Sequence, residues 1–261
     1  MNILFIGDIV GRTGRQVMAA RVHRLIDRHQ IDLVVANGEN AAAGFGLTMD
    51  IVRELFDLGV DAITSGNHIW DKKEIYEFLG GEPRLLRPAN YPPGLPGRGS
   101  GIFSTSAGLK VGVINLEGRV FMSNLECPFR TADRLVEDLS RRTSIILVDF
   151  HAEATSEKTA LGCYLDGRVS AIVGTHTHVQ TADERILPGG TAYLTDAGMT
   201  GSRDSVIGIR KELAIERFLT QLPVRFEVAK RAPVLNGIVF TIDEASGRAT
   251  GVQRIAEEVD L

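Results

Sequence analysis

The fold class follows from residues 1–40, which read MNILFIGDIVGRTGRQVMAARVHRLIDRHQIDLVVANGEN. Asn2–Gly7 is a short apolar run typical of a buried strand, and Asp32–Ala36 is a second one. Between them, Thr13–His29 has the apolar spacing of one helix face, with Val17, Met18, Val22, Leu25 and Ile26. This order predicts two parallel strands joined by a helical crossover.

The alternation of strands and helices continues along the chain. Strands are predicted at Asp61–Ser65, Lys110–Leu116, Ser144–Phe150 and Val169–Gly174. Helices are predicted over Met49–Leu58, Asp71–Leu79, Ala132–Arg142 and Ser156–Leu165. The C-terminal part adds shorter strands and one helix, at Thr191–Thr195, Val234–Ile242, Thr250–Ile255 and Lys211–Gln221. We therefore expect an α/β fold with a largely parallel sheet and a β-rich C-terminal half.

The segment Glu82–Gly101 is rich in proline and glycine, which predicts a surface excursion and not a linker between domains. The sequence has no internal repeat, low-complexity tract or block of like charges. We therefore expect a single domain spanning residues 1–261.

The composition limits the classes of function. A formal charge of −4 argues against a duplex-DNA binder, although a bound cation could still attract a small anionic substrate. Cys127 and Cys163 are the only cysteines, too few and too far apart for a disulfide framework or a thiolate zinc site. The N-terminus lacks the features of a signal peptide, and no run approaches the roughly 18 apolar residues of a membrane span. A soluble cytoplasmic protein is the expectation.

Polar residues follow five of the predicted strands at the point where each strand ends. The motifs are Gly7-Asp8, Asn37-Gly38-Glu39-Asn40, Gly66-Asn67-His68, His151 and Gly174-Thr175-His176-Thr177-His178. In open α/β sheets ligands bind at the carboxyl ends of strands, so these loops should converge on one crevice. The candidate metal ligands are Asp8, Glu39, Asn67, His151, His176 and His178.

The donor types indicate which metal would bind. Carboxylate, amide and imidazole donors without a thiolate favour Mn or Fe, with Zn as a further option. The set exceeds what one tetrahedral ion needs, which favours two ions about 3.5–4 Å apart that share a carboxylate. His176 and His178 would project to the same side of an extended segment. Glycines 7, 38, 66 and 174 would remove side-chain bulk where the backbone turns beside a ligand.

Each of these residues also has a simpler interpretation when taken alone. Asp8 could cap a helix, Asn67 could occupy a left-handed turn, and His151 could be a hydrogen-bonded core histidine. The pattern as a whole favours the metal site. Four of the six histidines lie in strand-end motifs, whereas His23 and His29 fall on a predicted helix and look like surface residues.

The motif Gly66-Asn67-His68, the isolated His151 and the final His176-Thr177-His178, in this order, resemble the metallophosphoesterase superfamily. The chain departs from the superfamily pattern in three places. Ile9-Val10 replaces the first histidine, Glu39-Asn40 replaces the bridging aspartate, and Thr175 is inserted before the last motif. These departures match a closer family, the YmdB-like metallophosphoesterases of bacteria, which the chain resembles over nearly its whole length.

The resemblance implies two packed β-sheets flanked by helices, in a four-layer sandwich, and a 2′,3′-cyclic nucleotide phosphodiesterase activity. It implies one ion held by Asp8, Glu39, Asn40 and His178. A second ion would be held by Glu39, Asn67, His151 and His176, so that Glu39 bridges the two. It also implies that His68 is the proton donor.

The corresponding mechanism is a hypothesis. Two ions would acidify a shared water, and the resulting bridging hydroxide would attack phosphorus in line. His68 would protonate the leaving ribose oxygen, with Asp71 a candidate to orient its ring; alternatively His68 only supports Asn67. The loop Ala41–Thr48 could line the pocket or simply turn the chain, and Gly198–Asp204 is expected to be a surface loop.

Other functions remain open at this point. One is a phosphatase or nuclease with the same chemistry, although few aromatic residues and an acidic balance argue against a long nucleic-acid track. Another is a metal-binding regulatory protein with little or no catalysis. An amidohydrolase is disfavoured because eight βα units are not visible. The expected partner is a small phosphodiester, without duplex DNA or membrane, and the fold would permit a homo-oligomer.

Overall fold

Two mixed β-sheets pack face to face in a computed structural model that describes residues 1–261. The first sheet has the order β2 (Asp8–Ile9), β11 (Met199–Ser202), β12 (Pro233–Ile242), β1 (Asn2–Ile6), β3 (Leu33–Asn37), β4 (Ala62–Thr64), and β13 (Ala249–Glu258) also pairs with β12. The second has the order β5 (Ser100–Ser104), β6 (Lys110–Glu117), β7 (Ile145–His151), β8 (Ala171–Thr175), β10 (Ala192–Leu194), β9 (Arg185–Ile186).

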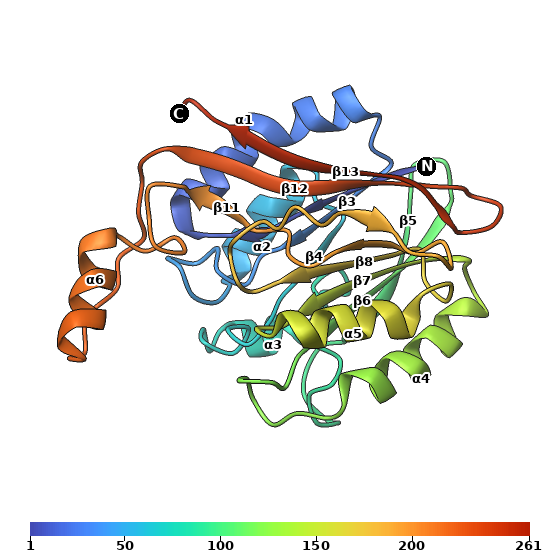
Figure 1. Ribbon diagram of the computed structural model, residues 1–261, viewed down its shortest axis with the longest axis horizontal. Helices are drawn as coiled ribbons and strands as arrows, with labels where there is room; N and C mark the ends of the chain where they lie inside the picture. Colours follow the sequence, from blue (N-terminus) through green and yellow to red (C-terminus); the bar gives the residue numbers. More distant parts are fainter.

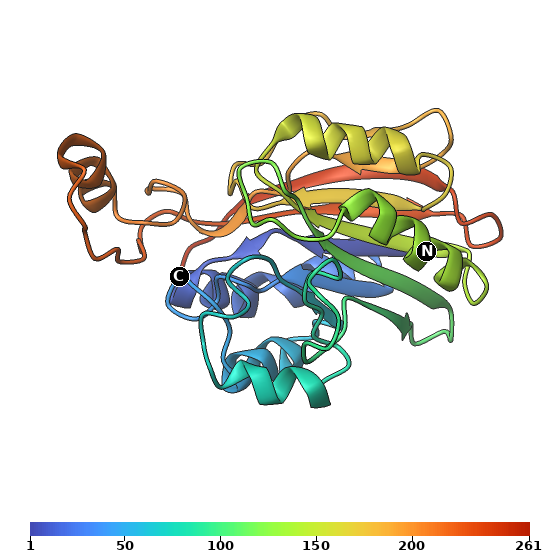
Figure 2. The ribbon, with the colours of Figure 1, turned by 90° about the horizontal axis from the view of Figure 1, so that it is seen from below.

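Helices cover the outer face of each sheet, as Figures 1 and 2 show. The first sheet is covered by α1 (Gly11–His29), α2 (Met49–Asp57) and α3 (Ile75–Gly81). The second is covered by α4 (Pro128–Ser140) and α5 (Thr155–Leu165). The remaining helix, α6 (Lys211–Thr220), projects away from the sheets together with the segments on either side of it (Figures 1 and 2).

The side chains of strand β1 contribute to two cores, one on each face of the first sheet. Because successive side chains of a strand point to opposite faces, Ile3 and Phe5 enter the core between the sheets. Leu4 and Ile6 pack instead against the helices on the outer face. Both faces of β1 are therefore buried, which is why its sequence is a continuous apolar run. The predicted four-layer α/β sandwich is confirmed.

The predicted parallel pairing holds for part of each sheet. β1, β3 and β4 are parallel, as are β6, β7, β8 and β10. The long strand β12 is antiparallel to β1, β11 and β13, and β5 is antiparallel to β6. The first sheet is mixed because the C-terminal hairpin β12–β13 returns to pair with the N-terminal strand. The second is mixed because β5 and β9 are antiparallel to their neighbours.

The interpretation of Glu82–Gly101 as a surface excursion is wrong for its first half and holds for its second half, where residues 92–95 are exposed. Leu85 and Leu86 are fully buried, and the hydrogen bond from the Leu86 N–H to the Ile63 carbonyl ties the segment to β4. The segment carries the chain from the first sheet to the second, and its first half passes through the interior. Its prolines and glycines resemble those of a loop, and its path depends on long-range contacts that local composition does not encode.

Two further observations bear on the general class of protein. Both cysteines are free thiols, as their spacing predicts. No helix combines the length and the apolar character needed to cross a membrane.

Candidate metal centre

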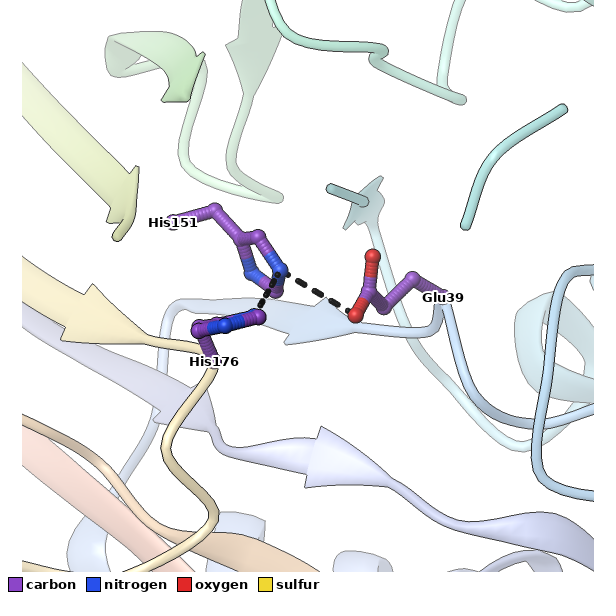
Figure 3. Close-up of side chains that lie close together, drawn as sticks. All are labelled: Glu39, His151 and His176. Carbon is purple, nitrogen blue, oxygen red and sulfur yellow. Dashed lines mark hydrogen bonds and ion pairs between the residues drawn. The ribbon is translucent and has the colours of Figure 1, made fainter. Parts of the chain in front are cut away.

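The carboxyl ends of the strands bring three predicted ligands into one cluster. Glu39 follows β3, His151 ends β7, and His176 follows β8. Each offers a ligand atom, and these atoms all lie within 4.8 Å of one another. Figure 3 shows the two imidazoles and the carboxylate turned toward a common point. Glu39 and His151 are buried and His176 is partly exposed.

The Nε2 atom of His151 is the centre of this cluster. It lies 3.1 Å from Glu39 Oε1, 3.0 Å from Asn67 Oδ1 and 3.0 Å from His176 Nδ1. Carboxylate and amide oxygens only accept hydrogen bonds, so one proton at most can be shared among these atoms. Atoms with lone pairs therefore converge where a cation would stabilise them.

Thr175 determines which nitrogen of His151 faces the cluster. Its hydroxyl donates to Asp149 Oδ1 at 2.8 Å and lies 2.9 Å from His151 Nδ1. Since that hydroxyl proton is already used, His151 Nδ1 must donate, so Nε2 is the nitrogen that faces Glu39 and Asn67 and would offer its lone pair to a cation that displaces its proton. Burial raises the pKa of Asp149 to about 7, and above that pH its carboxylate can only accept. In the sequence Thr175 looks like a simple insertion, and its role was missed.

A second group of predicted ligands adjoins the first. His178 Nε2 lies 3.8 Å from Asp8 Oδ1 and 3.1 Å from Asn40 Nδ2. Asn40 Nδ2 is also 3.1 Å from Glu39 Oε1, so Glu39 contacts both groups. Asn40 presents its amide nitrogen here, and offering its oxygen to a metal would need a half-turn of the amide. All seven predicted ligands are thus brought together, whereas their role as ligands stays a prediction.

Asp8 gives an independent reason to expect a cation at this cluster. Its side chain is fully buried, and Oδ1 has no hydrogen-bond partner. The other oxygen, Oδ2, accepts from the His176 N–H at 3.2 Å. A buried carboxylate oxygen without a partner is costly, and a bound cation removes that cost. Burial accordingly raises the pKa of Asp8.

The charges in the cluster are balanced by a proton on His151. Burial acts to raise the pKa of Glu39, but the neighbouring His151 outweighs it and lowers that pKa to about 2. Burial acts to lower the pKa of His151, but Glu39 outweighs it and raises that pKa to about 9. Burial, together with the charge on His151, lowers the pKa of His176 to about 3. The protein without metal thus holds one proton where a cation fits.

The two terminal histidines are not placed by an extended segment, so that prediction is wrong. Strand β8 ends at Thr175, and both His176 and His178 adopt left-handed backbone conformations, with φ of 98° and 64°. Non-glycine residues rarely adopt such angles, and they concentrate at functional sites. This turn directs His176 to the group around His151 and His178 to the group around Asp8.

A buried ion pair holds this turn. Asp196 Oδ2 accepts from the backbone N–H of Thr177 at 3.2 Å and from its hydroxyl at 2.8 Å. The same oxygen lies 2.6 Å from Lys158 Nζ, and both charged side chains are almost fully buried. Neither residue stands near a motif in the sequence, and only the fold places them beneath the two histidines.

The glycines beside the predicted ligands allow close approach of neighbouring atoms. A Cβ on Gly66 would lie 2.2 Å from the ring of His151, and one on Gly174 would lie 1.8 Å from the carbonyl oxygen of Thr195. None of glycines 7, 38, 66 and 174 has a positive φ, so they serve by removing side-chain bulk, as predicted, and not by adopting a left-handed conformation. Any larger residue at position 66 would displace the imidazole from the cluster.

His68 lies at the edge of the same cluster. Its side chain is 30% exposed, and Nδ1 lies 2.9 Å from Asp71 Oδ2, the contact that the sequence suggested. Its backbone N–H donates to Glu39 Oε2 at 3.2 Å, which fixes the main chain relative to the cluster. The ring of Phe45 packs edge-on against the imidazole at 5.1 Å.

A cavity of about 330 Å³ opens over the cluster. It is lined by Val10, Glu39, Asn40, Gly44, Phe45, His68, Glu153, His176, Thr177, His178, Ile207, Ile209 and Phe226. The loop Ala41–Thr48 therefore does line the pocket, through Gly44 and Phe45. Glu153 was missed by sequence reasoning, and its Oε2 lies 3.1 Å from His176 Nε2.

The interpretation of Gly198–Asp204 as a surface loop is wrong. Residues 199–202 form the buried strand β11 beside β2, and Arg203 forms an ion pair with Glu258. The run contains glycine, serine and threonine, which resemble a loop when read locally. Its strand pairing depends on residues almost 200 positions earlier in the chain.

Known proteins resemble this chain over its whole length. A family model described as "YmdB-like protein" matches residues 4–255. The 2′,3′-cyclic-nucleotide 2′-phosphodiesterase of Bacillus subtilis is 52% identical, over 98% of this chain and 96% of its own. The crystal structure of a hypothetical protein from Thermus thermophilus has a TM-score of 0.93 at 43% identity and covers 99% of each chain.

A phosphatase from Mycoplasma pneumoniae has a TM-score of 0.92 at 36% identity, over 99% of this chain and 93% of its own. The match to the family extends from β1 to the last strand and so includes every motif of the candidate metal centre. The chain therefore belongs to the YmdB-like protein family.

Proposed function

We propose that this protein is a metal-dependent phosphodiesterase that hydrolyses 2′,3′-cyclic nucleotides. The observation that carries the proposal is the convergence of Glu39, Asn67 and His176 on the Nε2 atom of His151. The relative from Bacillus subtilis, 52% identical, has this activity in its name. The cavity over the cluster has room for a small ligand. It adjoins the negatively charged Glu39 and the positively charged His151.

The residues of the cluster fit two metal ions. Asp8, Glu39, Asn40 and His178 would hold one, and the oxygen of Asp8 that lacks a partner favours a cation there. A second ion would be held by Glu39, Asn67, His151 and His176. Nitrogen and oxygen donors without sulfur favour Mn or Fe. When bound, the ions would acidify a water molecule and neutralise charge on the phosphoryl oxygens.

The protein's own residues would orient the ions and complete the proton transfer. Thr175 holds His151 in the tautomer that presents Nε2, and Lys158 with Asp196 holds the turn that carries His176 and His178. During hydrolysis the oxygen of a water molecule bonds to phosphorus and that water gives up one proton to the solvent, while the bond from phosphorus to one ribose oxygen breaks. That oxygen must gain a proton, and His68, held by Asp71, would donate it.

A comparison of substrates tests this proposal. We expect Mn²⁺-loaded protein to cleave 2′,3′-cyclic AMP in preference to adenosine 5′-monophosphate and to a short single-stranded oligonucleotide. Glu39→Gln is the negative control, because it keeps the shape of the side chain and removes the charge shared by both ion sites. Preferred cleavage of the monophosphate would instead favour a phosphatase. No cleavage by protein that holds its ions would favour the regulatory alternative.

A further inference from the structure

The cavity over the metal centre has an apolar side that the proposed chemistry does not use. Five apolar side chains line it, namely Val10, Phe45, Ile207, Ile209 and Phe226. Two of them are aromatic, in a chain in which only 6% of residues are aromatic. Ile207 is 53% exposed and Phe226 is 39% exposed, so both have apolar surface open to a ligand.

This apolar side is built from two segments that touch. Phe45 lies in the loop after β3, and Phe226 lies between α6 and β12. Residues 203–232, which join β11 to β12 and include α6, are called the arm (Figure 1). The loop has left-handed glycine at position 44, where an added Cβ would lie 2.9 Å from Val228 Cγ2. The loop and the base of the arm are therefore in close contact beside the cluster.

Hydrogen bonds fix the base of the arm relative to the metal centre. The Arg210 N–H donates to the carbonyl of Glu227 at 2.9 Å, and the Ala229 N–H donates to that of Gly208 at 2.8 Å. The carbonyl oxygen of Ile207 lies 2.8 Å from His178 Nδ1. The apolar side of the cavity is thus held at a set position from a predicted metal ligand.

We propose that this apolar side binds the nucleobase of the substrate, with Phe45 and Phe226 as the aromatic surfaces that contact its flat face. The inference rests on the proposed function, because it assumes that the phosphate lies at the metal centre. A nucleotide has one anionic end and one flat end of low polarity, and the cavity has a polar and an apolar side to match.

The chemistry of the five side chains also predicts how selective this subsite is. None of them carries a hydrogen-bonding group, so they cannot read the edge of a base. Stacking on aromatic rings tolerates every base, because each has a π-face. We therefore expect adenine and cytosine derivatives to bind within about one order of magnitude of each other.

Equilibrium binding tests the inference without requiring turnover. The ligands are adenosine 3′-monophosphate, cytidine 3′-monophosphate and a base-free methyl riboside 3-phosphate, titrated calorimetrically into Mn²⁺-loaded protein. The base should strengthen binding about tenfold or more, and Phe226→Ala should remove most of that gain. Phe226→Tyr should retain it. Phe218→Ala, an exposed aromatic on α6 outside the cavity, is the matched control and should change nothing.

Equal binding of the nucleotides and the base-free ligand by the unaltered protein would overturn the inference, as would binding of none of them. A loss in Phe226→Ala that is equal for all ligands would overturn it too. These outcomes are separate from the proposed function. If the protein cleaves 2′,3′-cyclic AMP but the base does not strengthen binding, the proposed function stands and the base subsite is contradicted. If the base strengthens binding but no cleavage occurs, the subsite stands and the proposed function is contradicted.

Discussion

At the scale of single residues, Thr175 is the side chain that orients the imidazole of the predicted ligand His151. Its hydroxyl accepts from His151 Nδ1 and donates to Asp149, which sets the imidazole tautomer. Thr175→Val keeps the shape and removes the hydroxyl. We expect it to weaken metal binding about 10–100-fold, the usual cost of losing such a partner. Competition with a chelator of known affinity measures this.

Thr191→Val is the matched control for that variant. Thr191 is also fully buried, and its hydroxyl donates to the carbonyl of Val169, far from the cluster. Both variants should lose stability, because each leaves a buried group without its partner. Only Thr175→Val should lose metal affinity. An equal metal affinity in the two variants would contradict the assigned tautomer.

The raised pKa of His151 predicts that metal binding depends on pH. With a pKa of about 9, His151 is protonated at pH 7 in protein without metal. A metal needs its Nε2 lone pair, so binding displaces a proton and the bound state holds fewer protons. The apparent affinity should therefore rise roughly tenfold per unit between pH 7 and pH 8.

Calorimetric titration of Mn²⁺ in two buffers that differ in ionisation enthalpy measures the released protons. The binding heats in the two buffers should differ by the difference between their ionisation enthalpies multiplied by about one released proton per chain. An affinity that is equal at pH 7 and pH 8, with equal heats in the two buffers, would show that His151 is neutral before the metal binds.

His68 offers a separate test of catalysis. His68→Ala should lower kcat about 10²–10⁴-fold, because a proton donor contributes that much, while the metal content stays the same. His23→Ala, on the exposed face of α1, should leave both unchanged. Steady-state kinetics and elemental analysis of the same samples give the two readings. Loss of ions from His68→Ala would instead mean that the residue supports the metal centre.

At the scale of elements, the turn after β8 depends on an ion pair that reaches it from α5. Lys158 and Asp196 are both almost fully buried. Lys158→Met keeps the apolar stem and leaves the carboxylate of Asp196 buried without a cation. The expected loss is about 3–5 kcal/mol in the free energy of unfolding, measured by urea denaturation.

Arg141→Met is the comparison for this loss. Arg141 pairs with Glu137 on the surface of α4, where the side chains are 68% and 72% exposed. Exposed pairs contribute little, so this variant should change the stability only slightly. If Lys158→Met cost no more than Arg141→Met, the buried pair would not be what holds the turn.

The sequence predicts elements well where their signals are local. The spacing of Val17, Val22 and Leu25 marks α1, and the observed helix begins only two residues before the predicted one. Strands β2 and β11 were not predicted, because each is short and is formed by pairing with strands remote in the sequence, β2 with β11 and β11 with β2 and β12. The helix expected over Asp71–Leu79 begins at Ile75, since residues before it turn to bring His68 and Asp71 together.

At the scale of the whole molecule, the convergence of the site could be predicted because it follows from a topological rule. Polar residues after parallel strands meet at one edge whatever the details of packing. The presence of a second sheet packed face to face against the first was expected only from the family resemblance. Strand β12 pairs with β1 across more than 230 residues, and no local pattern encodes that pairing.

The contacts that refine the site depend on the same long-range assembly. The hydrogen bond between Thr175 and His151 joins β8 to β7. The apolar side of the cavity combines residues of the loop after β3 with residues of the arm. Each needs two segments that are remote in sequence. The side chains that converge could therefore be predicted, whereas the residues that orient them required the fold.

The most direct test of the account is the activity of metal-free protein as Mn²⁺ is added in known equivalents, with 2′,3′-cyclic AMP as substrate. The account predicts no turnover without metal, a rise that levels off at about two ions per chain, and a single adenosine monophosphate isomer as product. Full turnover without metal, or none from protein that holds two ions, would contradict it.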